Sequence, residues 1–81
     1  MLAIFYQEGD GGSARVLTFI EEHGIQDLVV ARDIAFADAR AAFDRLRGSS
    51  TPALWDGERM HQGAEAVLAR LMAFLNVGRA D

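Results

Sequence analysis

TPALWDG, residues 51–57, is the segment around which we infer the rest of the architecture. Ala53-Leu54-Trp55 is a short apolar strand candidate, and residues 58–61 form a second candidate after the Asp-Gly pair. An Asp-Gly pair between two short strands is a strong hairpin signal, and a type I′ turn needs positive φ at both of its central residues. The segment therefore predicts an antiparallel hairpin around Asp56 and Gly57.

Toward the N-terminus, the chain predicts a strand, a glycine-rich loop and a helix. Leu2–Tyr6 is a continuous apolar run, which is typical of a strand buried on both faces. Polar and glycine residues fill positions 7–12, and apolar residues recur at helical spacing from Ser13 onward. Gly24 occupies the position where a left-handed C-cap would end this helix.

The middle of the chain repeats this strand and helix order. Residues 27–31 predict a short strand parallel to the first, joined to it by a right-handed helical crossover. Residues 36–47 predict an amphipathic helix that ends at Gly48, with its apolar stripe at Phe36, Ala39, Phe43 and Leu46.

A third helix closes the chain. Its apolar positions recur at helical spacing, and Gly78 follows them as an expected helix end; these positions are Val67, Leu68, Leu71, Met72 and Leu75. The predicted order is β-α-β-α-β-β-α, an α/β fold with a four-stranded mixed sheet and three helices. We find no linker or repeat, so we expect one domain over residues 1–81.

Composition narrows the classes of function. The 81 residues carry a formal net charge of -4, and the eight basic residues are scattered arginines, which disfavours nucleic-acid binding. No apolar run approaches the roughly 20 residues of a membrane span. The N-terminus lacks the features of a signal peptide, so the cytoplasm is the expected compartment.

Cysteine is absent from the sequence, which removes disulfides, thiolate metal ligands and thiol nucleophiles. The two histidines, His23 and His61, lack the partners of a recognisable metal motif, and we expect both at the surface. We therefore predict no metal site.

Two stretches together resemble the second half of the glutaredoxins and of glutathione-transferase N-terminal domains: residues 51–57 and MHQGAEAVL, residues 60–68. The resemblance spans essentially the whole chain and implies a thioredoxin-like fold. In these families a cis proline opens the third strand, and the peptide unit before it pairs with a bound peptide or glutathione. The resemblance gives this role to Thr51, beside Pro52; alternatively, Pro52 only stops the strand from extending.

The resemblance places the Cys-x-x-Cys motif of the family at residues 10–13, where this chain has Asp10, Gly11, Gly12 and Ser13. Asp and Ser both suit a helix start, because their oxygens accept from unpaired backbone amides and a carboxylate favours the positive end of the helix dipole. Without any cysteine, thiol-disulfide oxidoreductase activity is not expected. The main hypothesis is a non-redox domain that binds a peptide, a protein partner or a glutathione-like ligand in the groove beside a cis proline.

Glutathione binding has features for and against it. Three features support it. Thr51 precedes Pro52, and the glycine loop offers the amides of Gly11 and Gly12. Gln62, Gly63 and Glu65 belong to the turn at a helix start where the family holds the γ-glutamyl group. Against it, Gln7 takes the place of a lysine that often binds the terminal carboxylate in glutaredoxins. Glu8 and Asp10 add negative charge, and two like charges at about 4 Å cost roughly 1 to 4 kcal/mol. Any affinity should be weak.

Two alternatives remain open. The first is a stand-alone glutathione-dependent transferase module, in which the hydroxyl of Tyr6 or Ser13 stabilises the glutathione thiolate; Tyr6 can equally fill the core and Ser13 cap the helix. The second is a structural role as a homodimer, with Trp55 and Phe74 as contact residues.

Overall fold

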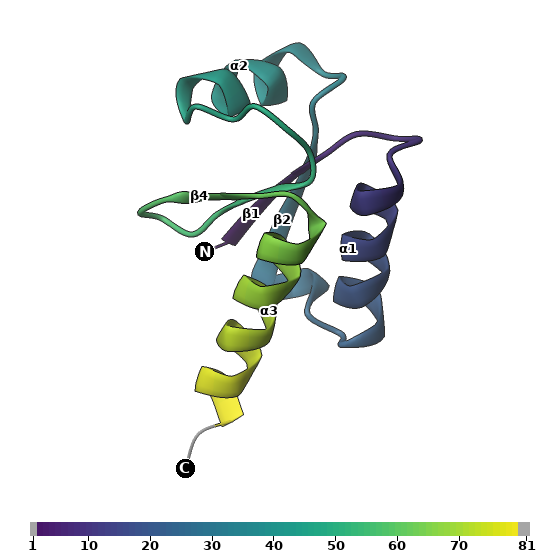
Figure 1. Cartoon of the computed structure of the whole chain (residues 1–81), viewed down its shortest axis with the longest axis vertical. Helices are drawn as coiled ribbons and strands as arrows, with labels where there is room; N and C mark the ends of the chain where they lie inside the picture. Colours follow the sequence, from purple (N-terminus) through teal and green to yellow (C-terminus); the bar gives the residue numbers. More distant parts are fainter. Residues whose placement is uncertain (1, 80–81) are drawn as a thin grey trace.

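A computed structural model describes the backbone of residues 2–79 and the side chains of residues 2–76. The part of the chain that it describes is α/β, with three α-helices and a four-stranded mixed sheet, as expected (Figure 1). In chain order the elements are β1 (Leu2–Tyr6), α1 (Gly11–Glu22), the 3-10 turn η1 (Gln26–Leu28), β2 (Val29–Asp33), α2 (Ala37–Arg45), β3 (Ala53–Trp55), β4 (Met60–Gln62) and α3 (Ala64–Arg79).

The sheet has the strand order β2-β1-β3-β4. β1 pairs in parallel with β2, whereas the β1–β3 and β3–β4 pairs are antiparallel. Successive side chains of β1 point to opposite faces of the sheet. Ile4 is buried with residues of α1 and α3, whereas Phe5 is buried with residues of α2. α1 and α3 thus cover one face of the sheet, and α2 covers the other (Figure 1).

The C-terminus of α1 has the predicted left-handed cap. Gly24 has φ of +63°, and its amide donates to the Glu21 carbonyl at 3.1 Å. The amide of buried Ile25 reaches back to the Ile20 carbonyl at 3.2 Å, which completes a Schellman motif. This cap turns the chain directly from α1 into η1 and β2.

The second strand begins later than predicted. Asp27 and Leu28 lie in η1, and the strand covers Val29–Asp33 instead of residues 27–31. The Leu28 amide donates to the Ile25 carbonyl at 2.9 Å, so the chain makes one tight turn before it extends.

The second helix is shorter than predicted at both ends. Phe36 is an extended N-cap residue that is 66% exposed, so it is not part of the apolar stripe. At the other end, Arg47 and not a glycine has positive φ, +66°. Gly48 is required for a different reason, because a Cβ there would lie 2.3 Å from the ring of buried Phe43.

The third helix differs from its predicted pattern in two respects. Met72, expected in the core, is 55% exposed, whereas Phe74 packs against the main core cluster and is partly buried. The helix also continues through Gly78 to Arg79, so Gly78 does not end it. Helices tolerate an internal glycine at a cost of about 1 kcal/mol relative to alanine.

The predicted hairpin between β3 and β4 is present, but its turn is not type I′. Gly57 has φ of +99°, whereas Asp56 does not have positive φ. Instead, the Asp56 carboxylate accepts from the amides of Glu58 at 2.8 Å and Arg59 at 2.9 Å. Its side chain therefore organises the turn.

Asp56 also anchors the hairpin to α3. Its Oδ2 atom lies 2.8 Å from Nε2 of His61 and accepts from Nε of Arg70 at 3.3 Å. The His61 side chain is only 20% exposed, so the expectation of a surface histidine is wrong. The Arg59 amide, followed by His61 and the Glu58 amide, holds the pKa of Asp56 well below its ordinary value of 3.8.

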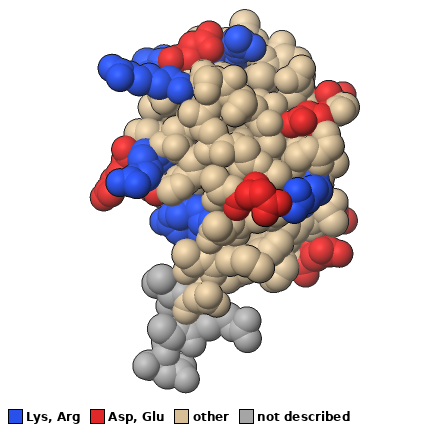
Figure 2. Space-filling model, viewed as in Figure 1, with Lys and Arg blue, Asp and Glu red and all other residues tan. Residues whose placement is uncertain are grey.

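Figure 2 shows arginines and carboxylates interspersed over one face of the molecule, without a continuous area of positive charge. Trp55, a predicted contact residue, packs partly buried against the smaller core cluster. None of the helices in the part of the chain that the structure describes has the length and hydropathy needed to cross a membrane.

Replacing Asp56 tests the anchoring of the hairpin. Because the pKa of Asp56 is lowered in the folded state, its stabilising contribution is complete above the ordinary value of 3.8 and is lost as the pH falls below it. We expect Asp56→Asn to lower Tm by several degrees at pH 7 and to flatten the fall of Tm between pH 5 and pH 2, measured by circular dichroism. Glu58→Gln, an exposed carboxylate of the same turn, is the control and should match the parent protein. Identical pH profiles for Asp56→Asn and the parent would contradict this assignment.

Candidate functional site

The Asp10 carboxylate joins two loops that are remote in the sequence. Its Oδ2 atom accepts from Oγ of Ser13 at 2.8 Å, from the Ser13 amide at 3.3 Å and from Oγ1 of Thr51 at 3.2 Å. Asp10 is the N-cap of α1, with extended backbone angles that suit this role. The start of α1 and the segment before β3 are thereby held together.

A close backbone contact strengthens this junction. A Cβ on Gly12 would lie 3.0 Å from Cδ of Pro52 and 3.4 Å from Cβ of Ala64, so the first turn of α1 packs closely against both residues. The Gly63 amide donates to the Pro52 carbonyl at 2.9 Å, and the Thr51–Pro52 peptide bond is cis. Segments 10–13, 51–52 and 63–64 therefore converge.

The hydrogen bonds at the junction favour a charged carboxylate. The Ser13 hydroxyl, followed by Thr51 and the backbone amides of Ser13 and Gly12, lowers the pKa of Asp10, while desolvation opposes the shift. The junction therefore carries a fixed negative charge at neutral pH.

Ser13 is a structural member of this junction. It is 1% exposed, and its hydroxyl donates to Asp10 and accepts from the Gln7 amide at 3.2 Å. A ligand could reach this hydroxyl only by breaking both hydrogen bonds. Asp10, not Ser13, is therefore the helix cap, and Ser13 connects this cap to the preceding loop.

A small polar hollow of about 180 Å³ lies beside Thr51. Exposed Ser49, Ser50 and Gln7 contribute to its wall, and Arg40 of α2 is the one cation that lines it. The Arg40 guanidinium lies 3.3 Å from Asp44, so its charge is already partly balanced. Ser49 and Ser50 were not among the predicted site residues, although they belong to the polar run before Pro52.

Gln62 lies near this hollow, but its side-chain oxygen already accepts hydrogen bonds from the loop before Thr51. Its Oε1 atom accepts from the Ser49 amide at 2.7 Å, the Ser49 hydroxyl at 2.9 Å and the Ser50 amide at 3.0 Å. Gln62 thus fixes the loop that precedes Thr51.

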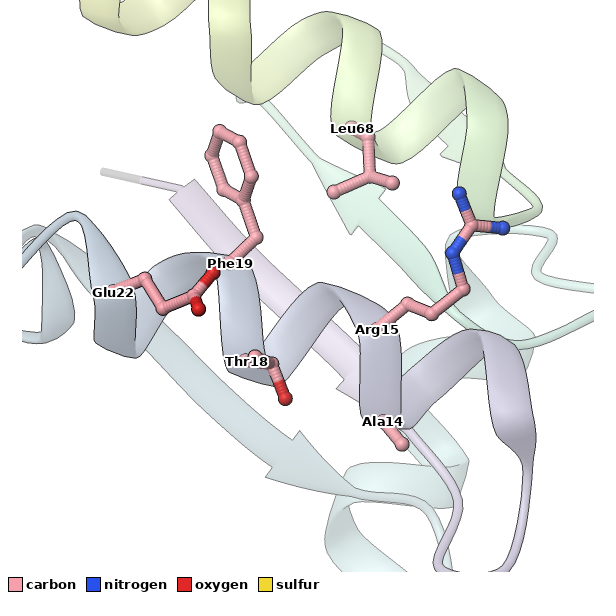
Figure 3. Close-up of a pocket in the computed structure, with 6 residues that line it drawn as sticks. All are labelled: Ala14, Arg15, Thr18, Phe19, Glu22 and Leu68. Atoms are coloured by element: carbon pink, nitrogen blue, oxygen red, sulfur yellow. The ribbon is translucent and has the colours of Figure 1, made fainter.

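Glu65 lies on a different surface. It forms an exposed ion pair with Arg15 at 3.2 Å, across the gap between α1 and α3. Figure 3 shows this groove, with Phe19 and Arg15 of α1 pointing toward α3 and Leu68 of α3 pointing toward α1. Phe19 of α1 and Leu68 of α3 contribute apolar side chains to it from the two helices, as expected at a seam between packed helices.

Tyr6 does not join the Asp10 cluster. It is partly buried against the main core and lines a hollow with Val30, Arg32 and Phe36, beside the N-terminus of α2. Gly11 lies at the start of α1, where an added Cβ would meet no other atom within 4 Å. Tyr6, one of the two residues considered for a transferase, thus lines a different hollow from the one beside Thr51.

Among residues 2–76, no group of three histidine, cysteine or carboxylate side chains is arranged to hold a metal ion. The chain matches no family model, no curated protein and no solved structure.

Two neighbouring glycines give a matched test of the junction. We expect Gly12→Ala to lower the free energy of unfolding by about 1 to 3 kcal/mol, because the new methyl group must displace Pro52 or Ala64. Gly11→Ala, which meets nothing within 4 Å, should be neutral or slightly stabilising. Urea unfolding of both variants provides the measurement. Equal stability of the two variants would show that α1 does not pack against Pro52 as described.

Proposed function

We propose that this chain is a thioredoxin-like domain without redox chemistry, which binds an extended peptide, a segment of a partner protein or a glutathione-like compound alongside Thr51. The strand order β2-β1-β3-β4, with one parallel and two antiparallel pairs, supports this fold assignment. The absence of cysteine from the 81 residues supports the non-redox part of the proposal.

The observation that carries the proposal is the free backbone of Thr51. Within the part of the chain that the structure describes, neither its amide nor its carbonyl makes a hydrogen bond, although Ser50 and Pro52 on either side do. Thr51 is held in place by its side chain, through Asp10. A fixed residue with an unpaired donor and acceptor is suited to pair with the backbone of an extended ligand, as one strand pairs with another.

The size of the adjacent hollow favours an extended ligand. Small-molecule sites usually enclose roughly 300 to 1,000 Å³, whereas this hollow measures about 180 Å³. It can take one side chain or one terminal group of a ligand that otherwise lies across the surface. The Ser50 hydroxyl, the side-chain amide of Gln7 and Arg40 suit a carboxylate or a polar side chain, whereas the Ser49 hydroxyl already donates to Gln62.

Charge limits the affinity for anionic ligands. Asp10 is ionised in the junction, and exposed Glu8 lies in the same loop. Both carboxylates oppose the negative charge of glutathione. A neutral peptide segment is therefore the better ligand, with glutathione as a weak one.

The transferase alternative has weaker support. It needs a free hydroxyl beside the bound thiol, but the Ser13 hydroxyl is buried with both of its hydrogen bonds made, and Tyr6 lines a different hollow.

A titration followed by backbone NMR tests the proposal. With a short neutral peptide in extended form, we expect the largest shifts at the amides of Ser50, Thr51 and Gly63, with millimolar or tighter affinity. Glutathione should shift the same amides more weakly. If neither ligand moves these signals at millimolar concentration, the proposed binding role is wrong.

Glu8→Gln provides the matched variant. Removing this exposed charge should increase the affinity for glutathione a few-fold at low salt, because like-charge repulsion falls, and leave the affinity for a neutral peptide unchanged. An equal change for both ligands would show that the effect is not electrostatic.

A further inference from the structure

The outer edge of β2 is an open strand edge. β2 is an end strand of the sheet and pairs with β1 through five residues, Val29–Asp33, whereas its other side has no partner strand in the part of the chain that the structure describes. Val29, Val30 and Ala31 are uncharged and the strand contains no proline, so the residues that often block the addition of another strand are confined to Arg32 and Asp33 at its end. Its backbone is therefore available for pairing along a full strand length.

A hollow lies on each face of this edge. On the α1 side, Val29 and Ala31 join Leu17, Ile20 and Glu21 around a hollow of about 290 Å³. On the α2 side, Val30, Arg32 and Phe36 line a hollow of about 470 Å³. An added strand would send successive side chains to alternate faces, and thus into the two hollows in turn.

Exposed apolar side chains concentrate at the same edge. Of the four large apolar residues that are well exposed among residues 2–76, three lie in or beside β2: Leu28 at 50%, Val30 at 43% and Phe36 at 66%. Such concentration on a small domain is typical of an interaction surface.

The charges around the edge indicate the chemistry of the occupant. The two hollows are lined by three carboxylates, those of Glu21, Asp33 and Asp38, and by one guanidinium, that of Arg32. Arg32 lies 3.4 Å from Asp38, so its charge is already balanced. The remaining negative charge favours a basic partner and disfavours a second copy of this chain, which would bring the same acidic edge.

We propose that the outer edge of β2 is a docking site for an extended segment of a partner protein in which apolar residues alternate with lysine or arginine. The apolar side chains enter the hollow beside α1. The basic ones meet Asp33 beside α2, and their aliphatic stems cover Val30 and Phe36 there. The two hollows at this edge share no lining residue with the hollow beside Thr51, so the sites are distinct, although Ile34, which follows β2, lines the latter.

The experiment is an NMR titration of the full chain with a short peptide of alternating valine and lysine. We expect shifts and slowed amide exchange at residues 29–33, with unchanged signals at Thr51 and Gly63. A peptide of alternating valine and glutamate, and one with the valines and lysines in separate blocks, should bind about tenfold or more weakly. No shifts at residues 29–33 at millimolar peptide, or equal binding of the three peptides, would overturn the proposal.

A matched pair of exposed alanines supplies the variants. Ala31→Lys places a positive charge and a long side chain on the edge, and should weaken binding about tenfold or more. Ala41→Lys adds the same charge on α2, away from both hollows, and should leave binding unchanged. Equal binding by the two variants would place the peptide elsewhere.

Sedimentation of the parent protein without peptide tests whether a second copy of the chain occupies the edge. We expect a monomer. A dimer that Ala31→Lys dissociates would show that a second copy occupies the edge, and would overturn the proposal.

Discussion

A carboxylate at the start of a helix is the constraint on which the arrangement of this molecule depends. Asp10 caps α1 through Ser13 and accepts at the same time from the Thr51 hydroxyl, which precedes β3. Since Gly12 packs against Pro52 in the same region, the helix start and the loop before β3 cannot move independently. The position of Thr51, and with it the free backbone that we assign to ligand binding, follows from this contact.

The same carboxylate determines what kind of site this is. A group that accepts three hydrogen bonds and has a lowered pKa is a poor base and a poor nucleophile, because its charge is already stabilised. We assign it the role of organising the loop. The neighbouring groups are hydroxyls, amides and one balanced arginine, which suit recognition by hydrogen bonding. Binding without chemistry is therefore the function that we propose for this site.

Much of the fold could be predicted because its signals are local. Three signals each come from a short stretch of sequence: the apolar run at Leu2–Tyr6, the glycine cap at Gly24 and the Asp-Gly pair of the hairpin. The errors arose where the direction of a side chain decides and the spacing of residues does not. Phe36 fits a helical stripe but lies before the helix, and Gly48 is required by the Phe43 ring and not by its own φ. At the site, the pairing of Gln62 with Ser49 and of Glu65 with Arg15 depends on side-chain directions that spacing does not contain.

The side-chain pKa of Asp10, measured by carbon-detected NMR, tests the central contact most directly. The account predicts a value below the ordinary 3.8 in the parent protein and a rise toward 3.8 in Thr51→Val, because that variant loses a hydrogen bond to the ionised form. An ordinary pKa in the parent, or a lowered pKa that Thr51→Val leaves unchanged, would contradict it.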